Sequence, residues 1–553
     1  MKLRRGKSLP VIACIAALAV LPILPYAIYG YAGQDFEYHV TAWLGLRTAW
    51  LTGHALPMWD PRANFGLGDV HLGMYPPGAM YVGGVLAMLM PLRYVPAFFV
   101  WIVTALSGVA MYWASRDFVA QRDRLAAALL YMLSPYLVTT ALVRFAAGEL
   151  LVQMLLPLLL LFFYRVVWLH QTRAVWLLGA VLGIGWFTNV PESVALFYLL
   201  LIVAAIFAGM QRSVLPVMLV AAAEILAGAL AAFYLAPLWV ERHWINQAGL
   251  IRVDPQRLLL FMPYAGAAVE TMKVFKYSCW LFACVIMLLV LSNWWTGARP
   301  VKGENATRTW RYLAVVAFLF QLPIALVLWR HLPQIGLVAF PFRFLPVMGA
   351  AVPLVLLARG SGLVYRRLAY CLIAAMTLVP LLEHARTQAT ASTRMPRFAE
   401  LERRWRIHGY EGMPEFVPPG AIRPRGPSEV STLTVDASGQ GSNCSLRAEH
   451  VEADEFNFHV TSDVPCQIRV PIYAYPYWHG TVSDGSGLPL GSDVDHTLIV
   501  AVSPGAHDVS LAFEPRSKVR TVSRILSVAA WLAFLFFFVR AWMSSSRVQS
   551  TRV

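Results

Sequence analysis

Two carboxylates and two arginines stand where long apolar segments of this chain meet short polar ones. Asp35 directly follows the first apolar run, and Arg144 and Glu149 lie between two later runs. Arg343 lies among aromatic residues where another apolar run begins. A carboxylate within reach of a hydroxyl can act as a general base, and the planar fork of an arginine suits a phosphate. The set therefore predicts chemistry between a hydroxyl acceptor and a phosphate-bearing donor.

Each of these side chains also has a purely structural interpretation. Asp35, with Glu37 and His39 beside it, is suited to cap a helix or to form a solvated boundary cluster. Arg144 and Glu149 are close enough in sequence to pair with each other, as buried charges normally do. The arginine among aromatic residues is equally suited to anchor a helix at a membrane surface. The residues alone leave both interpretations open.

The composition indicates an integral membrane protein. Hydrophobic residues make up 58% of the 553 residues. Charged residues make up 14%, against about 25% in soluble globular chains. The net charge of +15 comes mostly from Lys and Arg in the short segments between apolar runs, as the positive-inside rule describes. This distribution argues against nucleic-acid binding.

About twelve membrane crossings are expected from the length of the apolar runs, with both termini in the cytoplasm. The expected crossings are 9–31, 95–115, 124–142, 150–169, 174–189, 193–210, 214–238, 279–296, 312–329, 345–358, 367–384 and 523–541.

The first outer loop, 32–94, is expected to contain two helices that do not cross. The stretch from Tyr38 to Thr52 is typical of an amphipathic helix that lies on the membrane. The stretch 79–92 is apolar but short. If 79–92 crossed, every later basic cluster would change sides, so the positive-inside rule favours a half-helix or a surface helix there.

Residues 385–520 are polar and mixed, unlike the rest of the chain. They include segments that alternate in the manner of β-strands, such as Phe456–Val460 and Leu498–Val502. We expect a small β-sandwich outside the cytoplasm, held by the last helix. Cys444 and Cys466 both fall in this region, so a disulfide between them is predicted for an oxidising compartment.

Four groups of short motifs, in order along the chain, carry a family resemblance. They are Gly33–His39 with Gly53–Pro61, Gly66–Gly68 and Tyr75–Gly78; Ser134–Tyr136 with Arg144 and Gly148-Glu149; Ala232–Pro237; and Phe340–Leu345. With these motifs the sequence resembles the GT-C superfamily of membrane glycosyltransferases. It is most similar to the bacterial membrane family labelled 6-pyruvoyl-tetrahydropterin synthase-related. The outer β domain resembles that of GT-C proteins that decorate cell-surface polymers, through Pro476–Gly480, Asp484-Gly485 and Gly505–His507.

The resemblance implies an inverting sugar transfer at the outer face of the bacterial cytoplasmic membrane. The implied donor is a polyprenyl-phosphate sugar, and the implied acceptor is a lipid or a cell-envelope glycan. Asp35 matches the acidic residue of the family's first outer loop, and Glu149 matches the second-loop acid, where related enzymes often carry Asp. Both are the predicted catalytic residues. The predicted substrate-binding residues are Glu37, His39, Arg144 and Arg343.

The resemblance gives no single expectation for a metal. Some relatives need a divalent ion, Mg²⁺ or Mn²⁺, and others do not. The histidine–proline pair that is common in relatives is missing near Asn189–Glu192. No other cofactor is predicted.

The expected organisation is a mostly α-helical, GT-C-like membrane domain (1–384), an extracytoplasmic β-rich domain (385–520), and a C-terminal helix with a cytoplasmic tail (521–553). Two other functions are compatible with this organisation: a transporter or flippase of lipid-linked glycans, and a non-catalytic assembly protein for envelope polymers. Internal repeats and charges at mid-membrane are typical of a transporter. The chain has no evident repeat, and Glu224 is its one clear mid-helix acid.

Overall fold

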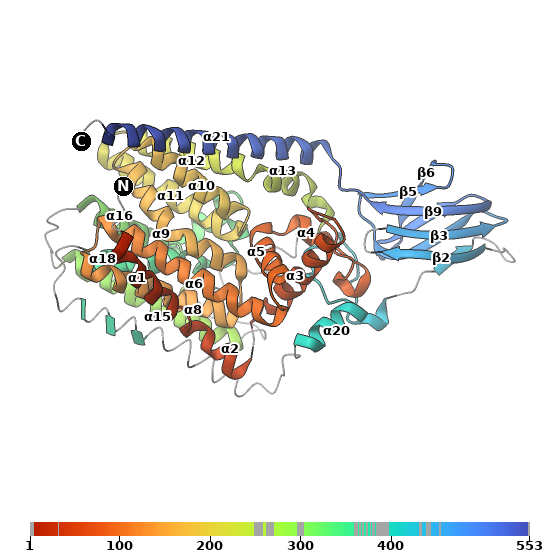
Figure 1. Ribbon diagram of the computed structural model, residues 1–553, viewed down its shortest axis with the longest axis horizontal. Helices are drawn as coiled ribbons and strands as arrows, with labels where there is room; N and C mark the ends of the chain where they lie inside the picture. Colours follow the sequence, from red (N-terminus) through yellow and green to blue (C-terminus); the bar gives the residue numbers. More distant parts are fainter. Residues whose placement is uncertain are drawn as a thin grey trace.

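The computed structural model describes residues 5–30, 33–247, 258–260, 270–295, 304–358, 398–430, 434–437, 444–452 and 455–550, with short stretches between 363 and 382. Helices form an elongated body, and a β domain lies at one end of it (Figure 1). The last helix runs back from the β domain along one side of the body (Figure 1). The predicted combination of a mostly helical chain with a small β domain near the C-terminus is confirmed.

The helices begin and end as follows: α1 Arg5–Leu18, α2 Leu24–Tyr29, α3 Phe36–Leu51, α4 His71–Met74, α5 Pro77–Leu89, α6 Val95–Ala114, α7 Arg124–Met132, α8 Pro135–Thr139, α9 Ala147–Val167, α10 Thr172–Trp186, α11 Val190–Gln211, α12 Leu215–Leu230, α13 Ala232–Glu241, α15 Glu270–Trp295, α16 Glu304–Leu319, α17 Leu326–His331, α18 Leu345–Leu356, α20 Phe398–His408 and α21 Lys518–Ser550. Several of them carry proline in their first turn, where the missing N–H has no intrahelical partner to lose. Examples are α6, α8, α11, α12 and α18.

Six described helical segments are long and apolar enough to cross a membrane: Leu9–Tyr26, Leu92–Asp117, Gln121–Arg144, Ala147–Val167, Val190–Gln211 and Lys518–Arg540. Two bent pairs, α12 with α13 and α16 with α17, raise the number to eight if each pair is one span. Other expected crossings are short helices, such as α10. With 15 residues α10 is about 22 Å long, less than the roughly 30 Å of a hydrocarbon core. Twelve crossings therefore remain a prediction, and most of 367–384 lies outside the described residues.

The two expected helices of the first outer loop are present as α3 and α5. The N-terminal half of α3 is buried on almost all sides, which differs from the expected amphipathic helix on the membrane surface. Trp43 of α3 is fully buried and donates through Nε1 to the carbonyl oxygen of Ala79 at 3.2 Å. Gly83 of α5 lies against the Trp43 ring, where a Cβ atom would collide with it. The glycine thus allows α3 and α5 to pack against each other inside the protein.

The β domain consists of two antiparallel sheets, with strand orders β1-β4-β8-β7 and β2-β3-β9-β5-β6. The strands are β1 Thr434–Ala437, β2 Cys444–Glu452, β3 Glu455–Ser462, β4 Cys466–Tyr473, β5 Trp478–Val482, β6 Gly487–Leu488, β7 Leu490–Ser492, β8 Thr497–Val502 and β9 Gly505–Phe513. Alternate residues face inward, as predicted from the sequence: Phe458 and Val460 of one sheet share a buried core with Ile468 and Val500 of the other.

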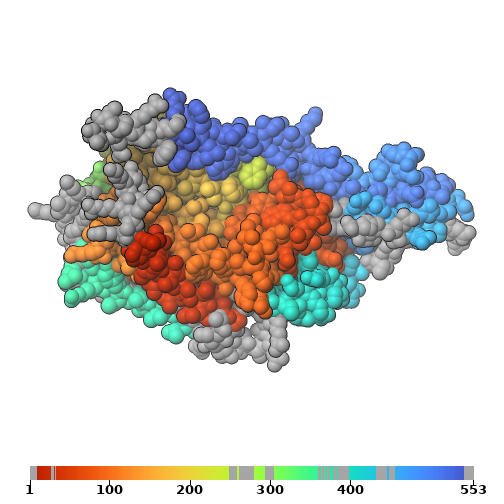
Figure 2. Space-filling view, viewed as in Figure 1, coloured from red at the N-terminus to blue at the C-terminus, as the bar shows by residue number. Residues whose placement is uncertain are grey.

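The first outer loop joins the β domain to the helical body. Trp59 packs against the rings of Tyr475, Trp478 and Phe513, with centroid distances of 5.3–5.8 Å. Gly68, with a φ of +69°, passes directly beneath the Trp59 ring. The surface view shows the turquoise segment of α20 lying against the orange first outer loop, beside the blue β domain (Figure 2). The outer loop is thus enclosed between the helical body and the β domain.

Candidate functional site

Glu149 lies in the first turn of α9, and only 1% of its surface is exposed. Arg144 Nη1 donates to Glu149 Oε2 at 2.5 Å, and Arg343 Nε donates to Glu149 Oε1 at 2.8 Å. The hydroxyl of Tyr136 also donates to Oε2, at 3.1 Å. A buried carboxylate needs such donors to offset its lost hydration. Both oxygens of Glu149 are therefore occupied, and the carboxylate holds two arginines in fixed positions.

Aromatic rings form one wall around the two arginines. The guanidinium of Arg343 lies 4.9 Å from the Phe340 centroid, and that of Arg144 lies 5.6 Å from Phe340 and 5.4 Å from Phe342. Arg343 Nη1 also donates to the carbonyl oxygen of Val338 at 2.6 Å. Its side chain is only 10% exposed, so it points into the protein and does not reach out as a membrane anchor.

The backbone between α8 and α9 positions Arg144 next to Glu149. A π-helical turn, Thr140–Arg144, ends at Phe145, which has a left-handed φ of +52°. Gly33, with a φ of +146°, packs against the Cβ atom of Phe145, where any side chain at position 33 would collide. The close approach brings the start of α3 against the start of α9.

Asp35 is the residue immediately before α3, but its side chain makes no capping hydrogen bond. Its carboxylate also has no hydrogen bond or ion pair with any described residue. Burial raises the pKa of Asp35 to about 6. Arg144 and Arg343 lower this pKa, whereas Glu149 and Glu415 raise it further. The structure thus brings Asp35, Glu149 and both arginines within electrostatic reach of one another, whereas their roles in catalysis and binding stay predictions.

His39 and Glu37, which were predicted to bind substrate, lie differently. His39 is 1% exposed, and its Nε2 accepts the N–H of Ala147 at 3.3 Å. That N–H is one of the unpaired donors at the start of α9. Burial lowers the pKa of His39 to about 3, so the ring is neutral and can accept this hydrogen bond at the start of α9. Glu37 is exposed and lies 3.9 Å from Arg404 of α20, so it faces away from this group.

The structure adds two acidic residues that the sequence did not single out as site residues. Glu192, in the first turn of α11, is 2% exposed and interacts electrostatically with Glu149 and both arginines. Its Oε2 has no hydrogen-bond partner among the described residues. Glu415, from the segment after α20, interacts electrostatically with Asp35. The Asn–Val–Pro–Glu pattern around Glu192 gave a helix-start signal, whereas no local signal pointed to Glu415.

The described donors do not suit a divalent cation. Among the described residues there is no group of three or more His, Cys, Asp or Glu side chains arranged to hold a metal ion. Both oxygens of Glu149 accept from arginines, whose charges would repel a cation at that position.

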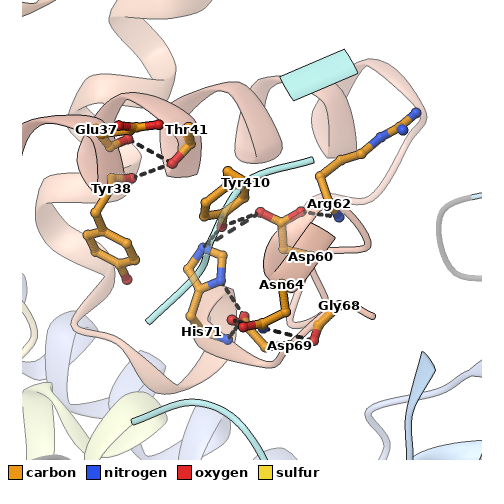
Figure 3. Close-up of polar contacts among 10 residues, drawn as sticks. All are labelled: Glu37, Tyr38, Thr41, Asp60, Arg62, Asn64, Gly68, Asp69, His71 and Tyr410. Atoms are coloured by element: carbon orange, nitrogen blue, oxygen red, sulfur yellow. Dashed lines mark hydrogen bonds and ion pairs between the residues drawn. The ribbon is translucent and has the colours of Figure 1, made fainter. Parts of the chain in front are cut away.

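A second buried polar cluster lies within the first outer loop. Figure 3 shows Asp60, Asp69 and His71 converging with Tyr410, which enters from the segment after α20. His71 Nδ1 lies 2.5 Å from Asp69 Oδ1, and the Tyr410 hydroxyl donates to Asp60 Oδ2 at 2.9 Å. Burial opposes protonation of His71, but Asp69 and Asp60 outweigh burial and raise the pKa of this residue. The cluster thus fixes the outer loop to the segment that leads into the β domain.

Ring contacts link the two groups. Tyr38, in the first turn of α3, lies three residues after Asp35. Its ring, drawn in Figure 3, is 5.6 Å from the ring of His71 and 5.2 Å from that of Tyr75. Tyr75 in turn interacts electrostatically with Asp35 and Arg343, and its pKa is raised, chiefly by burial. The cluster around His71 therefore supports the helix that begins directly after Asp35.

In the β domain, Cys466 is disulfide-bonded. The side chain of Cys444, its predicted partner, lies outside the described residues, so the pairing stays a prediction. Cys14, Cys279, Cys284 and Cys371 are free thiols.

No protein-family model and no curated protein matches the chain. Among solved structures, the chain is similar to the apo form of an Archaeoglobus fulgidus oligosaccharyltransferase (14% identity, TM-score 0.42, covering 76% of this chain and 62% of that one). It is also similar to AglB from Archaeoglobus fulgidus in complex with an inhibitory peptide and a dolichol-phosphate. The identity is 15% and the TM-score 0.43, and the match covers 76% of this chain and 61% of that one. A third similar structure is the arabinofuranosyltransferase AftD from mycobacteria. The identity is 22% and the TM-score 0.38, and the match covers 68% of this chain and 26% of that one. The chain thus spans about three fifths of the length of the archaeal proteins and about a quarter of AftD.

Proposed function

We propose that this protein is a GT-C-type membrane glycosyltransferase that transfers a sugar from a polyprenyl-phosphate donor to an acceptor hydroxyl at the outer face of the bacterial cytoplasmic membrane. One observation carries the proposal: a carboxylate without a partner among the described residues, Asp35, lies beside two arginines that share one buried glutamate. The proposal rests on this geometry together with the order of the sequence motifs.

Asp35 is the general base of the proposed reaction. Its carboxylate takes the proton of the acceptor hydroxyl as the acceptor oxygen attacks the anomeric carbon. The bond from that carbon to the donor phosphate oxygen breaks, and its electron pair leaves with the phosphate. Because the acceptor attacks from the face opposite this bond, the configuration inverts. With a pKa of about 6, Asp35 is ionised at neutral pH yet more basic than an ordinary aspartate. A base with a pKa near the working pH gives the most effective proton transfer, about 10²–10⁴-fold.

The two arginines stabilise the phosphate that leaves. Each uses part of its guanidinium to bind Glu149, and the Nη2 atoms of Arg144 and Arg343 have no hydrogen bond with the described residues. A planar guanidinium with a free N–H can donate to a phosphate oxygen, and burial strengthens that interaction. Glu149 is then a positioning residue: it fixes both guanidinium groups and leaves the Nη2 atom of each free to donate to the phosphate.

Two further polar residues, His39 and Tyr136, act by holding Glu149 in place. Neutral His39 accepts from the first amide of α9 and so fixes the turn that carries Glu149. Tyr136 adds a third donor to the same carboxylate. Glu37 faces Arg404 at the surface, so substrate binding in the proposed reaction does not involve it.

The experiment that tests the function is mass spectrometry of envelope lipids and polymers from cells that carry the parent protein, no protein, or Asp35→Asn. We expect the same glycan to be shortened and the same lipid-linked sugar to accumulate in the last two strains. Glu411→Gln, which changes an exposed carboxylate paired with Arg423, is the matched control and should behave as the parent does. An Asp35→Asn strain with a normal glycan, together with a changed glycan in the strain without protein, would favour a transporter or an assembly protein.

A further inference from the structure

A small cavity lies where the first outer loop, α13 and the start of α21 meet. It offers about 50 Å³ of space for water-sized groups. A single water needs about 10–15 Å³ of such space, so the cavity suits a group with about four oxygen atoms. Its lining includes Tyr75, Tyr81, Tyr234 and two arginines, Arg520 and Arg524.

The two arginines of the cavity differ in their partners. Arg520 is buried and pairs with Glu241 of α13 through both Nη2 and Nε, and Tyr477 of the β domain also donates to Glu241 at 2.6 Å. Arg524 lies one turn further along α21, is exposed, and makes no hydrogen bond or ion pair with any described residue. Because Glu241 offsets only one arginine, the cavity retains one excess positive charge, which complements a single anion.

The cavity lies at the end of a helix that faces lipid. The apolar span Lys518–Arg540 is only 11% buried inside the protein, and Val522 and Ile525, on either side of Arg524, are strongly exposed. An exposed apolar surface of this length is typical of a lipid-facing helix. Arg524 therefore stands at the level where lipid headgroups begin, beside the tyrosines that commonly occupy this depth.

We propose that this cavity binds the phosphate headgroup of an anionic lipid from the surrounding leaflet. Arg524 is the cation that reaches the phosphate, and Arg520, fixed by Glu241, forms the polar floor. The acyl chains of the lipid lie along the exposed face of α21. The inference does not depend on the proposed sugar transfer, but the two sites share Tyr75, which lines the cavity and interacts with Asp35 and Arg343.

The test is photo-crosslinking of the purified full-length protein, in neutral nanodiscs, with a phosphatidylglycerol that carries a photoreactive group near its phosphate. Crosslinked peptides are mapped by mass spectrometry, without any sugar donor. We expect crosslinks to the cavity segments around Tyr75 and Arg524. Arg524→Gln should lower their yield about five-fold, from the effect of one cation at a lipid surface. Leu56→Trp, which fills the cavity mouth from an exposed position, should lower it at least as much.

Controls separate this site from general attraction to anionic lipid. Arg540→Gln removes an exposed arginine at the other end of the same span and should leave the cavity crosslinks unchanged. Excess phosphatidylglycerol should compete, whereas phosphatidylcholine should not. Equal crosslinking in the parent, Arg524→Gln and Leu56→Trp would overturn the site. Loss in Arg524→Gln alone would place the lipid on the open surface, and competition by inorganic phosphate equal to that by lipid would overturn the lipid as the occupant.

Discussion

The backbone amide of Asp35 donates a hydrogen bond of 2.9 Å to the carbonyl oxygen of Arg144. The amide of Gln34 makes a second bond, of 3.2 Å, to the carbonyl oxygen of Val143. These two bonds tie the start of α3 to the turn before α9. They hold the proposed base close to the first arginine through the backbone. The carboxylate of Asp35 makes no capping hydrogen bond to α3, so it is available to accept a proton.

Asp35→Asn should change the pH dependence of stability. Because burial raises the folded-state pKa from its ordinary value of 3.8 to about 6, the folded protein holds a proton that the unfolded chain releases between these values. The parent therefore loses stability as pH rises from about 4 to 6, whereas the amide variant does not titrate. We expect Asp35→Asn to gain thermal stability relative to the parent between pH 4 and pH 7, as measured by thermal unfolding in detergent. If the two proteins differ in melting temperature by the same amount at pH 4 and at pH 7, the pKa of Asp35 is not raised.

Arg343→Lys should lower transfer although the charge is kept. A lysine cannot donate to Glu149, the Val338 carbonyl and a phosphate through one planar fork. We expect a fall in turnover and in apparent donor affinity, of about 10-fold or more, as for the loss of a charge-assisted hydrogen bond. Steady-state kinetics with a defined donor measure both quantities. Normal values for both would show that Arg343 has only a structural role.

Glu149→Gln should destabilise the protein strongly, because it leaves two buried arginines without a counter-charge. Breaking a buried ion pair in this way costs about 3–5 kcal/mol. The matched control is Asp117→Asn, which breaks the Asp117–Arg165 pair at 2.8 Å, where the side chains are 54% and 32% exposed. That exposed pair should contribute less than about 1 kcal/mol. Similar unfolding curves for both variants would contradict the account of Glu149 as a buried positioning residue.

The orientation of the chain can be tested with topology reporters. From the distribution of basic residues we expect a reporter fused after Ala391 to be extracytoplasmic and one fused after Pro300 to be cytoplasmic. Enzymatic reporters that are active on only one side of the membrane make the measurement. Reversal of both results would show that 79–92 crosses the membrane and that Asp35 lies on a different side from the later loops.

The sequence predicted the parts of the site that depend on local pattern. Strand β3 follows from alternation of apolar residues, and the pairing of Arg144 with Glu149 follows from their spacing of five residues. The contact between Arg343 and Glu149, across 194 positions, was not predicted. The sequence placed the two residues only on the same face of the membrane.

Other contacts have no local signal at all. The bond from Tyr410 to Asp60 joins residues 350 positions apart, and Glu415 reaches Asp35 from beyond the membrane helices. Helix α3 was predicted as a helix, but its partners were not. Because hydrophobic periodicity does not distinguish lipid from protein as the covering surface, the burial of Trp43 against α5 was not anticipated.

The most direct test of the account is sugar transfer by purified protein from a defined polyprenyl-phosphate sugar to its acceptor, with the parent, Asp35→Asn and Asp35→Glu compared at neutral pH. We expect Asp35→Asn to bind the donor with normal affinity and to have turnover reduced by about 10²–10⁴-fold, because only the base is lost. Asp35→Glu should keep part of the activity. Normal turnover by Asp35→Asn in folded protein would contradict the account, whichever result the other variants give.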